Sequence, residues 1–306
     1  MMEEKILVSV IVLSYNSENT ITDTLDSIYN QTYQEIELII SDDCSKDATK
    51  DVVESWLENH NGRFVSVKTN FKERNAGVAI NGDEGVRLST GTWIKCIAAD
   101  DKLIESCIEK NLKYVYENNS QIVFSNMHYV RKGETVTKEE DCLRNKLKLF
   151  SHLDVSEQYQ KLLIENPLPA PTAFFSRKLY DSVGGFDRDI CMLEDWPFWI
   201  RVTKSGVRIA YNDLYTVVYR MSDNSVSHND NFWKEAKKVK EKYCYPNIPK
   251  KKFLYFYHEN WHNMMWLCRN KVKDSRIKCI LVSLIFGVFW PPYLVKYVKS
   301  IIRSLI

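Results

Sequence analysis

LVSVIVLS (residues 7–14) is a continuous stretch of mostly apolar and β-branched residues, and Tyr15 and Asn16 follow its last residue, Ser14. A run of this kind, without alternation of polar residues, is typical of a strand buried on both faces, as in a parallel sheet. Apolar residues then recur at helical spacing over 19–30, and a second short apolar strand is predicted at 36–41. The first forty residues therefore predict the beginning of a strand–helix–strand unit.

The same alternation continues along the chain. The pattern predicts strands at 64–69, 92–98 and 121–129 and helices at 46–59, 77–88 and 103–117. Repeated alternation predicts stacked βαβ units, and hence an α/β fold with a mostly parallel sheet flanked by helices on both faces.

Beyond residue 130 the pattern is less regular. Residues 131–146 are charged and predict a surface excursion, and NPLPAPTAFF (166–175) is expected to be extended because it contains three prolines in five positions. The remaining predicted elements are a short helix at 177–183 stopped by Gly184-Gly185, a helix at 195–204, and one or two strands at 207–220.

Charge divides the 306-residue chain into two regions. The net charge is only +2, but residues 234–306 hold 16 Lys and Arg against four Asp and Glu, so the preceding part is acidic. A composition of 44% hydrophobic and 27% charged residues excludes general disorder. The near-neutral whole gives no support to nucleic-acid binding. We predict a catalytic domain at 1–228 and a helical, basic and apolar region at 229–306.

The C-terminal region contains a run of 17 uncharged residues, CILVSLIFGVFWPPYLV (279–295), between Lys278 and Lys296. The run is short for a spanning helix and is broken by Pro291-Pro292. Its basic flanks and aromatic residues favour a helix lying in one leaflet of an anionic membrane surface. The alternative is a buried helical hairpin that packs on the catalytic body.

The cysteines and the N-terminus indicate the compartment. None of the eight Cys forms a CxxC pair, and the first apolar run follows acidic residues, unlike a signal peptide. We expect reduced cysteines and a cytoplasmic protein held peripherally or monotopically at the inner face of the cell membrane.

Pairs of acids follow two of the predicted strands. Asp42-Asp43 follows the second strand and Asp100-Asp101 follows the fourth. Ligands of open parallel sheets bind beyond the carboxyl ends of the strands, and adjacent carboxylates are relieved of mutual repulsion by a hard divalent cation. Each pair could instead cap the helix that follows it. The two pairs together favour a cation that holds a diphosphate.

Other nucleotide chemistries lack their motifs. No GxGxxG follows the first strand, and GxxxxGK[ST] is absent from the sequence. HENWH (258–262) has the HExxH spacing, but it stands in a basic, aromatic segment without a nearby acid pair, which favours packing or interface residues over zinc ligands. The two absent motifs argue against dinucleotide oxidoreductases and P-loop NTPases.

Four segments in fixed order carry a resemblance to a known family. SVIVLSYN (9–16), ELIISDDCSKDAT (37–49), RNAGVAINGDEGVRLSTGTWIKCIAADDKL (74–103) and GGFDRDICMLEDWPFWIRV (184–202) resemble glycosyltransferase family 2. The resemblance covers about residues 6–225. It implies a GT-A fold and an inverting transfer from a nucleotide-sugar, of the kind found in bacterial surface-glycan synthesis.

The resemblance also implies roles for strand-end residues. Ser14, Tyr15, Asn16 and Asp42 or Asp43 would surround a uracil-like base. The DxD-type motif falls at Asp100-Asp101, with Asp100 reaching the ribose or metal and Asp101 ligating Mn²⁺ or Mg²⁺. Where many members have D-x-D-D, this chain has Ala98-Ala99-Asp100-Asp101.

The ED of MLEDWPFW matches the catalytic acid motif of the family. An inverting transfer needs one carboxylate to deprotonate the acceptor hydroxyl. Asp195 is the predicted base and Glu194 the alternative; both could instead only favour the helix N-terminus. Trp196 and Trp199 are either a sugar platform or core residues, and core is favoured for Trp199.

The remaining predicted contacts belong to loops. Arg74, Asn75 and Asn81 lie near the phosphate edge in the family layout, and Arg220 and His228 lie where a loop closes over the diphosphate. His228 is also a candidate metal ligand. QxxRW, the mark of processive synthases, is absent after residue 195, so transfer of a single sugar is expected.

The sequence therefore predicts a metal-dependent glycosyltransferase that uses a nucleotide-sugar, with UDP preferred, and a lipid-linked glycan acceptor at the cytoplasmic membrane surface. Two alternatives are a nucleotidyltransferase and a catalytically inactive membrane-associated binding module. SYNSENT (14–20) stands where nucleotidyltransferases carry a basic, Gly-rich loop, and the intact Asp101 and Asp195 argue against an inactive module.

Overall fold

The computed structural model describes residues 5–131, 133–221 and 230–248. The chain divides into two compact units, Met1–Pro246 and Asn247–Ile306, and the first contains the sheet and nearly all of the described residues. The apolar run 279–295 and His228 lie outside the described residues, so the predictions made for them are not addressed by the structure.

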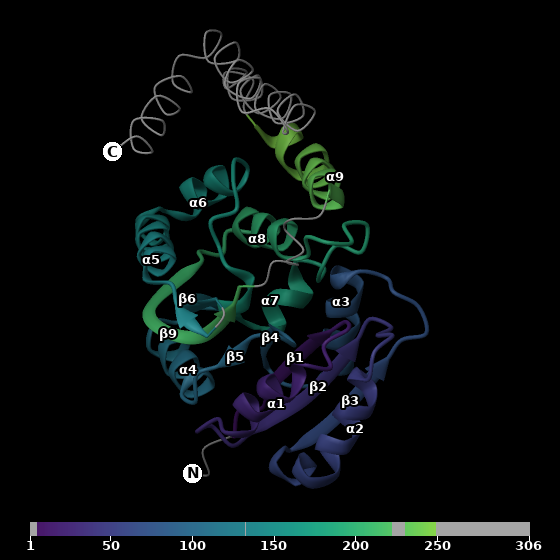
Figure 1. The fold of residues 1–306 in the computed structure, drawn as a ribbon. Helices are drawn as coiled ribbons and strands as arrows, with labels where there is room; N and C mark the ends of the chain where they lie inside the picture. The colour runs from purple at the N-terminus through teal and green to yellow at the C-terminus, as the bar shows by residue number, and fades with distance from the viewer. Residues whose placement is uncertain (1–4, 132, 222–229, 249–306) are drawn as a thin grey trace, which may run out of the picture. The chain divides into compact units, whose positions relative to one another are not determined.

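The first half of the sheet is parallel and confirms the alternation read from the sequence. Its strands are β1 (Val8–Ser14), β2 (Ile36–Asp42), β3 (Ser66–Phe71) and β4 (Trp93–Ala98). They lie in the order β3-β2-β1-β4 (Figure 1). Every residue of β2 is buried, and so is every residue of β1 except Leu13. Burial on both faces explains why these strands show no polar alternation.

Three helices connect these strands: α1 (Ile21–Tyr29), α2 (Thr49–His60) and α3 (Val78–Leu88). The chain moves outward from β1 to β3 and then returns past β1 to β4, so right-handed crossovers place α3 on the face opposite α1 and α2. Gly85 lets α3 lie directly on β1, because a Cβ there would be 2.7 Å from Ile11 Cγ2. The reversal makes the boundary between β1 and β4 the topological switch point, where open α/β sheets bind ligands.

The second half of the sheet is mixed. Its strands are β5 (Lys102–Leu103), β6 (Ile122–Arg131), β7 (Glu134–Thr135), β8 (Phe174–Ser176) and β9 (Ala210–Arg220). Strand β8 joins the two halves of the sheet, because it pairs antiparallel with both β4 and β6. Strand β9 pairs parallel with β6 on one side and antiparallel with β5 on the other. The described strands thus form one nine-stranded mixed sheet, and the predicted parallel arrangement holds for β1–β4 and for β6 with β9.

Six further helices accompany this half of the described chain. They are α4 (Cys107–Glu117), α5 (Thr137–His152), α6 (Val155–Leu162), α7 (Arg177–Ser182), α8 (Asp195–Lys204) and α9 (Asp230–Val239). Short helical turns are η1 (Asn61–Arg63), η2 (Ala170–Thr172), η4 (Lys240–Cys244) and η5 (Tyr245–Asn247). The predicted helix at 195–204 and the single strand ending at Arg220 agree with the structure.

Two predictions for the connecting segments were wrong. The segment taken as an irregular excursion forms the 16-residue helix α5, because Leu143, Leu147 and Phe150 recur at helical spacing and are buried beneath a charged surface. The helix predicted from 103 begins only at Cys107, since Lys102–Leu103 pair with β9 as β5. The Pro-rich segment is extended as predicted except for the turn η2.

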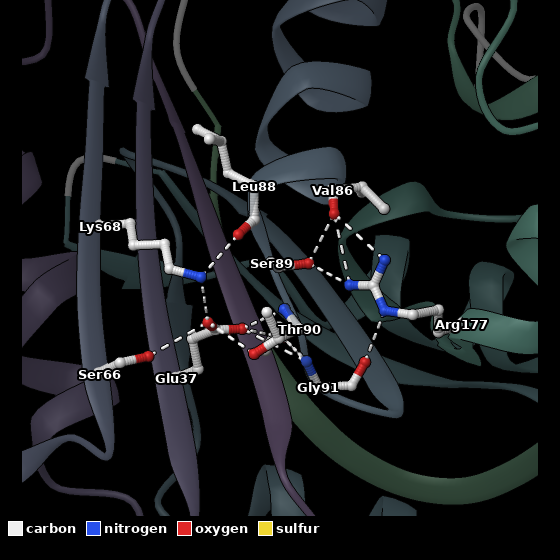
Figure 2. A network of polar contacts seen from close by, with 10 residues as sticks. Glu37, Ser66, Lys68, Val86, Leu88, Ser89, Thr90, Gly91 and Arg177 are labelled. Carbon is white, nitrogen blue, oxygen red and sulfur yellow. Dashed lines mark hydrogen bonds and ion pairs between the residues drawn. The ribbon is translucent and has the colours of Figure 1, made fainter.

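A buried carboxylate joins the amino-end side of the sheet to its loops (Figure 2). Glu37 of β2, whose side chain is 0% exposed, accepts from Lys68 Nζ of β3 at 2.9 Å and from the Thr90 backbone N–H at 2.6 Å. Burial alone would raise its pKa, but hydrogen bonds from Thr90, Ser9 and Lys68 outweigh burial and lower the pKa to about 2. This network stabilises the end of the sheet away from the strand termini at Ser14 and Asp42.

Within the described residues, no helix is both long enough and apolar enough to cross a membrane.

Candidate active site

Three strands end side by side at the switch point. Ser14 pairs in register with Asp42, Leu13 pairs with Ala98, and the Ala99 backbone N–H donates to Leu13 O at 2.9 Å. Ser14 Oγ donates to Asp42 Oδ2 at 2.8 Å. The residues that the sequence placed at three strand ends therefore meet along one edge of the sheet.

The carboxylate of Asp42 organises the turn that follows β2. Its two oxygens accept from the Ser45 backbone N–H at 2.8 Å and from Ser45 Oγ at 2.6 Å. Asn16, which has a φ of 51°, accepts from the Lys46 N–H through Oδ1 at 2.8 Å. Asp42 therefore shapes the rim and does not cap α2, whose N-cap is Ala48. Tyr15 is 51% exposed on this rim.

Asp43 holds the loop between β3 and α3. It accepts from the backbone N–H groups of Ala76 at 2.9 Å and Gly77 at 2.8 Å, and Lys72 Nζ lies 3.1 Å from Oδ1. Gly77 has a φ of 91°, and a Cβ there would be 2.6 Å from Cys191 O. This loop exposes Arg74 and Asn75 to solvent at its tip.

Asn81 lies beneath the edge. It is 2% exposed; its Nδ2 donates to Ser41 O at 2.7 Å and its Oδ1 accepts from Ser41 Oγ at 2.8 Å. The structure therefore places this amide between α3 and β2, where it fixes the helix on the strand that ends in Asp42.

Asp101 presents an unpaired oxygen at the end of β4. The residue is 1% exposed, and its Oδ1 accepts from the Arg220 backbone N–H at 2.9 Å. Its Oδ2 is buried and has no hydrogen-bond partner in the described chain. Burial holds the pKa of Asp101 well above its ordinary value, and the charge of Asp100 is the second cause. Burial also raises the pKa of Asp100. These two acids do not cap a helix, because α4 begins only at Cys107.

These residues fit a divalent cation. A buried carboxylate oxygen without a partner is costly, and a cation relieves that cost. Magnesium-type sites commonly use one or two carboxylates together with substrate phosphates and water. In the part of the chain that the structure describes, no group of three or more His, Cys, Asp or Glu side chains is arranged to hold a metal. Asp101, with Asp100 beside it, is thus the group suited to share a cation with a bound diphosphate.

The Arg220 side chain faces helix α1. Its Nη2 donates to Asp23 Oδ2 at 2.7 Å, and Lys102 Nζ lies 3.0 Å from the same oxygen. Asp23 was not singled out in the sequence, where nothing marks it as different from other helix-surface acids. The cluster fixes the end of β9 beside Asp101.

Glu194 and Asp195 open helix α8. Burial raises the pKa of both carboxyls, and for Glu194 the charge of Asp195 adds to that effect. Glu194 also affects Cys96 of β4. Burial is the main cause that raises the pKa of the Cys96 thiol to about 12, and the charge of Glu194 is the second. The second acidic pair therefore lies near the strand that leads to Asp100 and Asp101.

The aromatic residues of α8 are core residues. Trp199 is 1% exposed and packs against Phe124 and Phe175, which confirms the favoured prediction for it. Trp196 is 7% exposed, and its Nε1 donates to Leu162 O at 2.8 Å. The two rings hold α8 in place and so fix its first turn.

One contact of this first turn and one contact of the loop before it were not found from the sequence. Asp195 Oδ2 accepts from Asn166 Nδ2 at 2.7 Å, and Glu235 Oε2 of α9 accepts from the Cys191 N–H at 2.8 Å in the loop before the helix. Asn166 lies 29 residues before its partner and Glu235 lies 44 residues after its own. Local patterns carry no signal for either contact.

The sequence matches a known protein family and several named relatives. The model of the family described as Glycosyl transferase family 2 matches residues 9–184. TuaG of Bacillus subtilis, a glycosyltransferase named for teichuronic acid biosynthesis, is 28% identical over 77% of this chain and 86% of its own length. WfaP of Escherichia coli, a UDP-Glc:alpha-D-GlcNAc-diphosphoundecaprenol beta-1,3-glucosyltransferase, is 25% identical over 73% of this chain and 80% of its own.

A solved structure shares the fold. The mannosyltransferase PcManGT from Pyrobaculum calidifontis, in complex with GDP-Man and Mn²⁺, superposes with a TM-score of 0.62 over 99% of this chain and 81% of its own, at 18% identity. The fold is thus the GT-A-like α/β fold of sugar-transferring enzymes. The chain belongs to glycosyl transferase family 2, and it is a glycosyltransferase.

Proposed function

We propose that this glycosyltransferase moves one sugar from a UDP-sugar to a hydroxyl of a lipid-linked glycan, with inversion at the anomeric carbon and dependence on Mn²⁺ or Mg²⁺. The observation that carries the proposal is the buried Oδ2 of Asp101 at the switch point, which has no hydrogen-bond partner among the described residues. A second, separate carboxyl pair at 194–195 lies near the same strand. One acidic group is suited to a cation and the other to proton transfer.

The donor is assigned to the edge formed by β2, β1 and β4. Tyr15 is exposed where a base can stack, and the loop held by Asp43 presents Arg74 and Asn75. Asp101 and Asp100 would hold the cation, which when bound neutralises charge on the diphosphate leaving group. The residues assigned to donor binding, directly or by supporting the edge, are Ser14, Tyr15, Asn16, Asp42, Asp43, Arg74, Asn75, Asn81, Asp100 and Arg220. His228 remains a proposed further ligand.

The transfer itself is assigned to Asp195. The acceptor oxygen attacks the anomeric carbon, the bond from that carbon to the diphosphate oxygen breaks, and the nucleoside diphosphate leaves with the electron pair. The acceptor proton passes to the carboxylate of Asp195. Because burial raises the pKa of Asp195, this carboxylate is a stronger base than an exposed aspartate.

A relative and the sequence support the proposed acceptor and location. WfaP is named for a diphosphoundecaprenol acceptor and a UDP-Glc donor. Such an acceptor is held in a membrane leaflet, and the basic, apolar run near the C-terminus suits contact with an anionic surface. We therefore place the enzyme at the cytoplasmic face of the membrane in surface-polysaccharide synthesis.

The test is a transfer assay on the full chain with a panel of UDP- and GDP-sugars, diphosphoundecaprenol-linked sugar, and Mn²⁺, Mg²⁺ or EDTA. Release of the nucleoside diphosphate and the anomeric configuration of the product, determined by NMR, are the readouts. Metal-dependent transfer with inversion is expected, and Asp101→Asn should abolish it. Asp51→Asn, which changes an exposed acid on α2, is the matched control. Transfer that persists in EDTA, or a product with retained configuration, would contradict the proposal.

A further inference from the structure

Asn166 contacts the proposed base through one end of its amide. Its Nδ2 donates to Asp195 Oδ2 at 2.7 Å, while its Oδ1 accepts from the Leu168 backbone N–H at 3.2 Å. The two partners are chemically opposite, since a carboxylate only accepts and a backbone N–H only donates. The amide therefore has one orientation that satisfies both, and its donor end faces Asp195.

The segment that carries Asn166 is held firmly at its other end. Lys95, which is 0% exposed, donates from Nζ to Pro171 O at 2.5 Å and to Ala173 O at 3.3 Å. Lys95 belongs to β4, the strand that leads to Asp100. Prolines restrict φ along the segment, and Leu168 within it is buried. The Pro-rich segment is thus a rigid link between β4 and the first turn of α8.

Both side-chain donors to Asp195 act on the same oxygen. Trp199 Nε1, on the buried face of α8, lies 3.3 Å from the Oδ2 that Asn166 contacts. In the described part of the chain, no side chain donates a hydrogen bond to Oδ1. We infer that Asn166 is a positioning residue, which holds Oδ2 so that Oδ1 faces the acceptor hydroxyl. This inference rests on the proposed role of Asp195 as the base.

The contact also acts on basicity. Burial raises the pKa of Asp195, and the hydrogen bond from Asn166 opposes that rise by stabilising the charged form. Removing the donor should therefore raise the pKa of Asp195 further. The acidic limb of the kcat profile would move to higher pH, which a purely structural role of Asn166 would not produce.

Asn166→Asp is the sharpest variant. It keeps an oxygen that can accept from Leu168 but replaces the amide donor with a second carboxyl facing Asp195. We expect kcat at neutral pH to fall about tenfold or more, the acidic limb to rise by about one pH unit, and the donor KM to stay unchanged. Asn118→Asp makes the same chemical change at the exposed C-cap of α4 and should leave all three parameters unaltered.

A swapped pair tests the contact without relying on activity. Asn166→Asp should lower Tm, and adding Asp195→Asn restores a donor opposite an acceptor with the roles exchanged. The double variant should recover at least half of the lost Tm but no activity, since the base is gone. Additive Tm losses, or an Asn166→Asp enzyme with the wild-type kcat and pH profile, would overturn the inference. A wild-type chain that transfers no sugar would instead refute the proposed function. The comparison of Tm among the wild type, the two single variants and the double variant would still test the contact between Asn166 and Asp195.

Discussion

The backbone N–H of Arg220 donates to Asp101 Oδ1 at 2.9 Å, although the two residues lie 119 positions apart. The end of β9 therefore satisfies one oxygen of the carboxylate and leaves Oδ2 buried without a partner. Within the described chain, the charged form of Asp101 therefore has no hydrogen-bond donor at Oδ2, and burial holds its pKa well above the ordinary value. In the proposed function, a cation held with a bound donor would compensate this oxygen.

The first prediction concerns Asp101. Burial and Asp100 raise its pKa, so without metal the charged form destabilises the folded state at neutral pH. We expect Asp101→Asn, which removes the charge, to raise the free energy of unfolding in EDTA and to abolish the Tm increase given by UDP with Mn²⁺. Thermal unfolding with and without both ligands measures this. A variant that keeps the Mn²⁺-dependent increase would show that Asp101 is not the ligand.

The second prediction concerns the base. Asp195→Asn preserves the shape of the side chain and removes the proton acceptor, so kcat should fall by about 10² or more while donor affinity barely changes. Steady-state kinetics and calorimetric UDP binding measure the two quantities. Glu194→Gln, the matched change at the neighbouring residue, should retain a higher kcat than Asp195→Asn. Near-wild-type turnover in Asp195→Asn would transfer the role to Glu194 or another group.

The third prediction concerns Glu37 and pH. Its pKa in the folded protein is about 2, below the ordinary value of 4.5, which corresponds to about 3 kcal/mol of stability. The stabilisation that comes from this lowered pKa is fully present above the ordinary pKa of about 4.5, and it is lost as the pH falls toward 2. Glu37→Gln should therefore cost about 3 kcal/mol in urea unfolding at pH 7, and its difference from wild type should shrink at pH 3.

The control for this variant is Glu54→Gln, which removes an exposed partner of Lys50 on α2. It should change stability by less than about 1 kcal/mol at either pH. A Glu37→Gln deficit that is the same at pH 3 and pH 7 would mean that packing, and not the ionised network of Figure 2, accounts for the loss.

The fourth prediction concerns the basic, apolar C-terminal run, which lies outside the described residues. If it anchors the enzyme, truncation after Asp274 should release the protein from anionic liposomes, because each basic residue near such a surface contributes about 1 kcal/mol. UDP binding should survive, since the residues assigned to the donor precede position 229. Sedimentation and calorimetry test both points. Undiminished sedimentation would reject the anchor, and loss of folding would favour packing on the catalytic body.

The local pattern of the chain was enough to predict much of the fold. The runs at 7–14 and 36–41 lack polar alternation because β1 and β2 are buried on both faces, and α8 was predicted with its observed bounds. The segment of α5 was misread because its charges obscured a helical spacing of Leu143, Leu147 and Phe150. Strand β8 could not be predicted as the antiparallel joint, since three residues give no indication of their partners.

For the site, the sequence by itself determined which acids stand at strand ends, because parallel strands deliver their carboxyl ends to one edge. The tertiary structure decided what each acid does there: Asp42 accepts hydrogen bonds from its own turn and Asp43 from the loop between β3 and α3, whereas Oδ2 of Asp101 has no hydrogen-bond partner among the described residues. The hydrogen bonds from Asn166 to Asp195 and from Arg220 to Asp101 likewise could not be predicted from the sequence. Hydrogen-bond partners depend on which distant segments pack together, and the spacing of neighbouring residues does not encode that information.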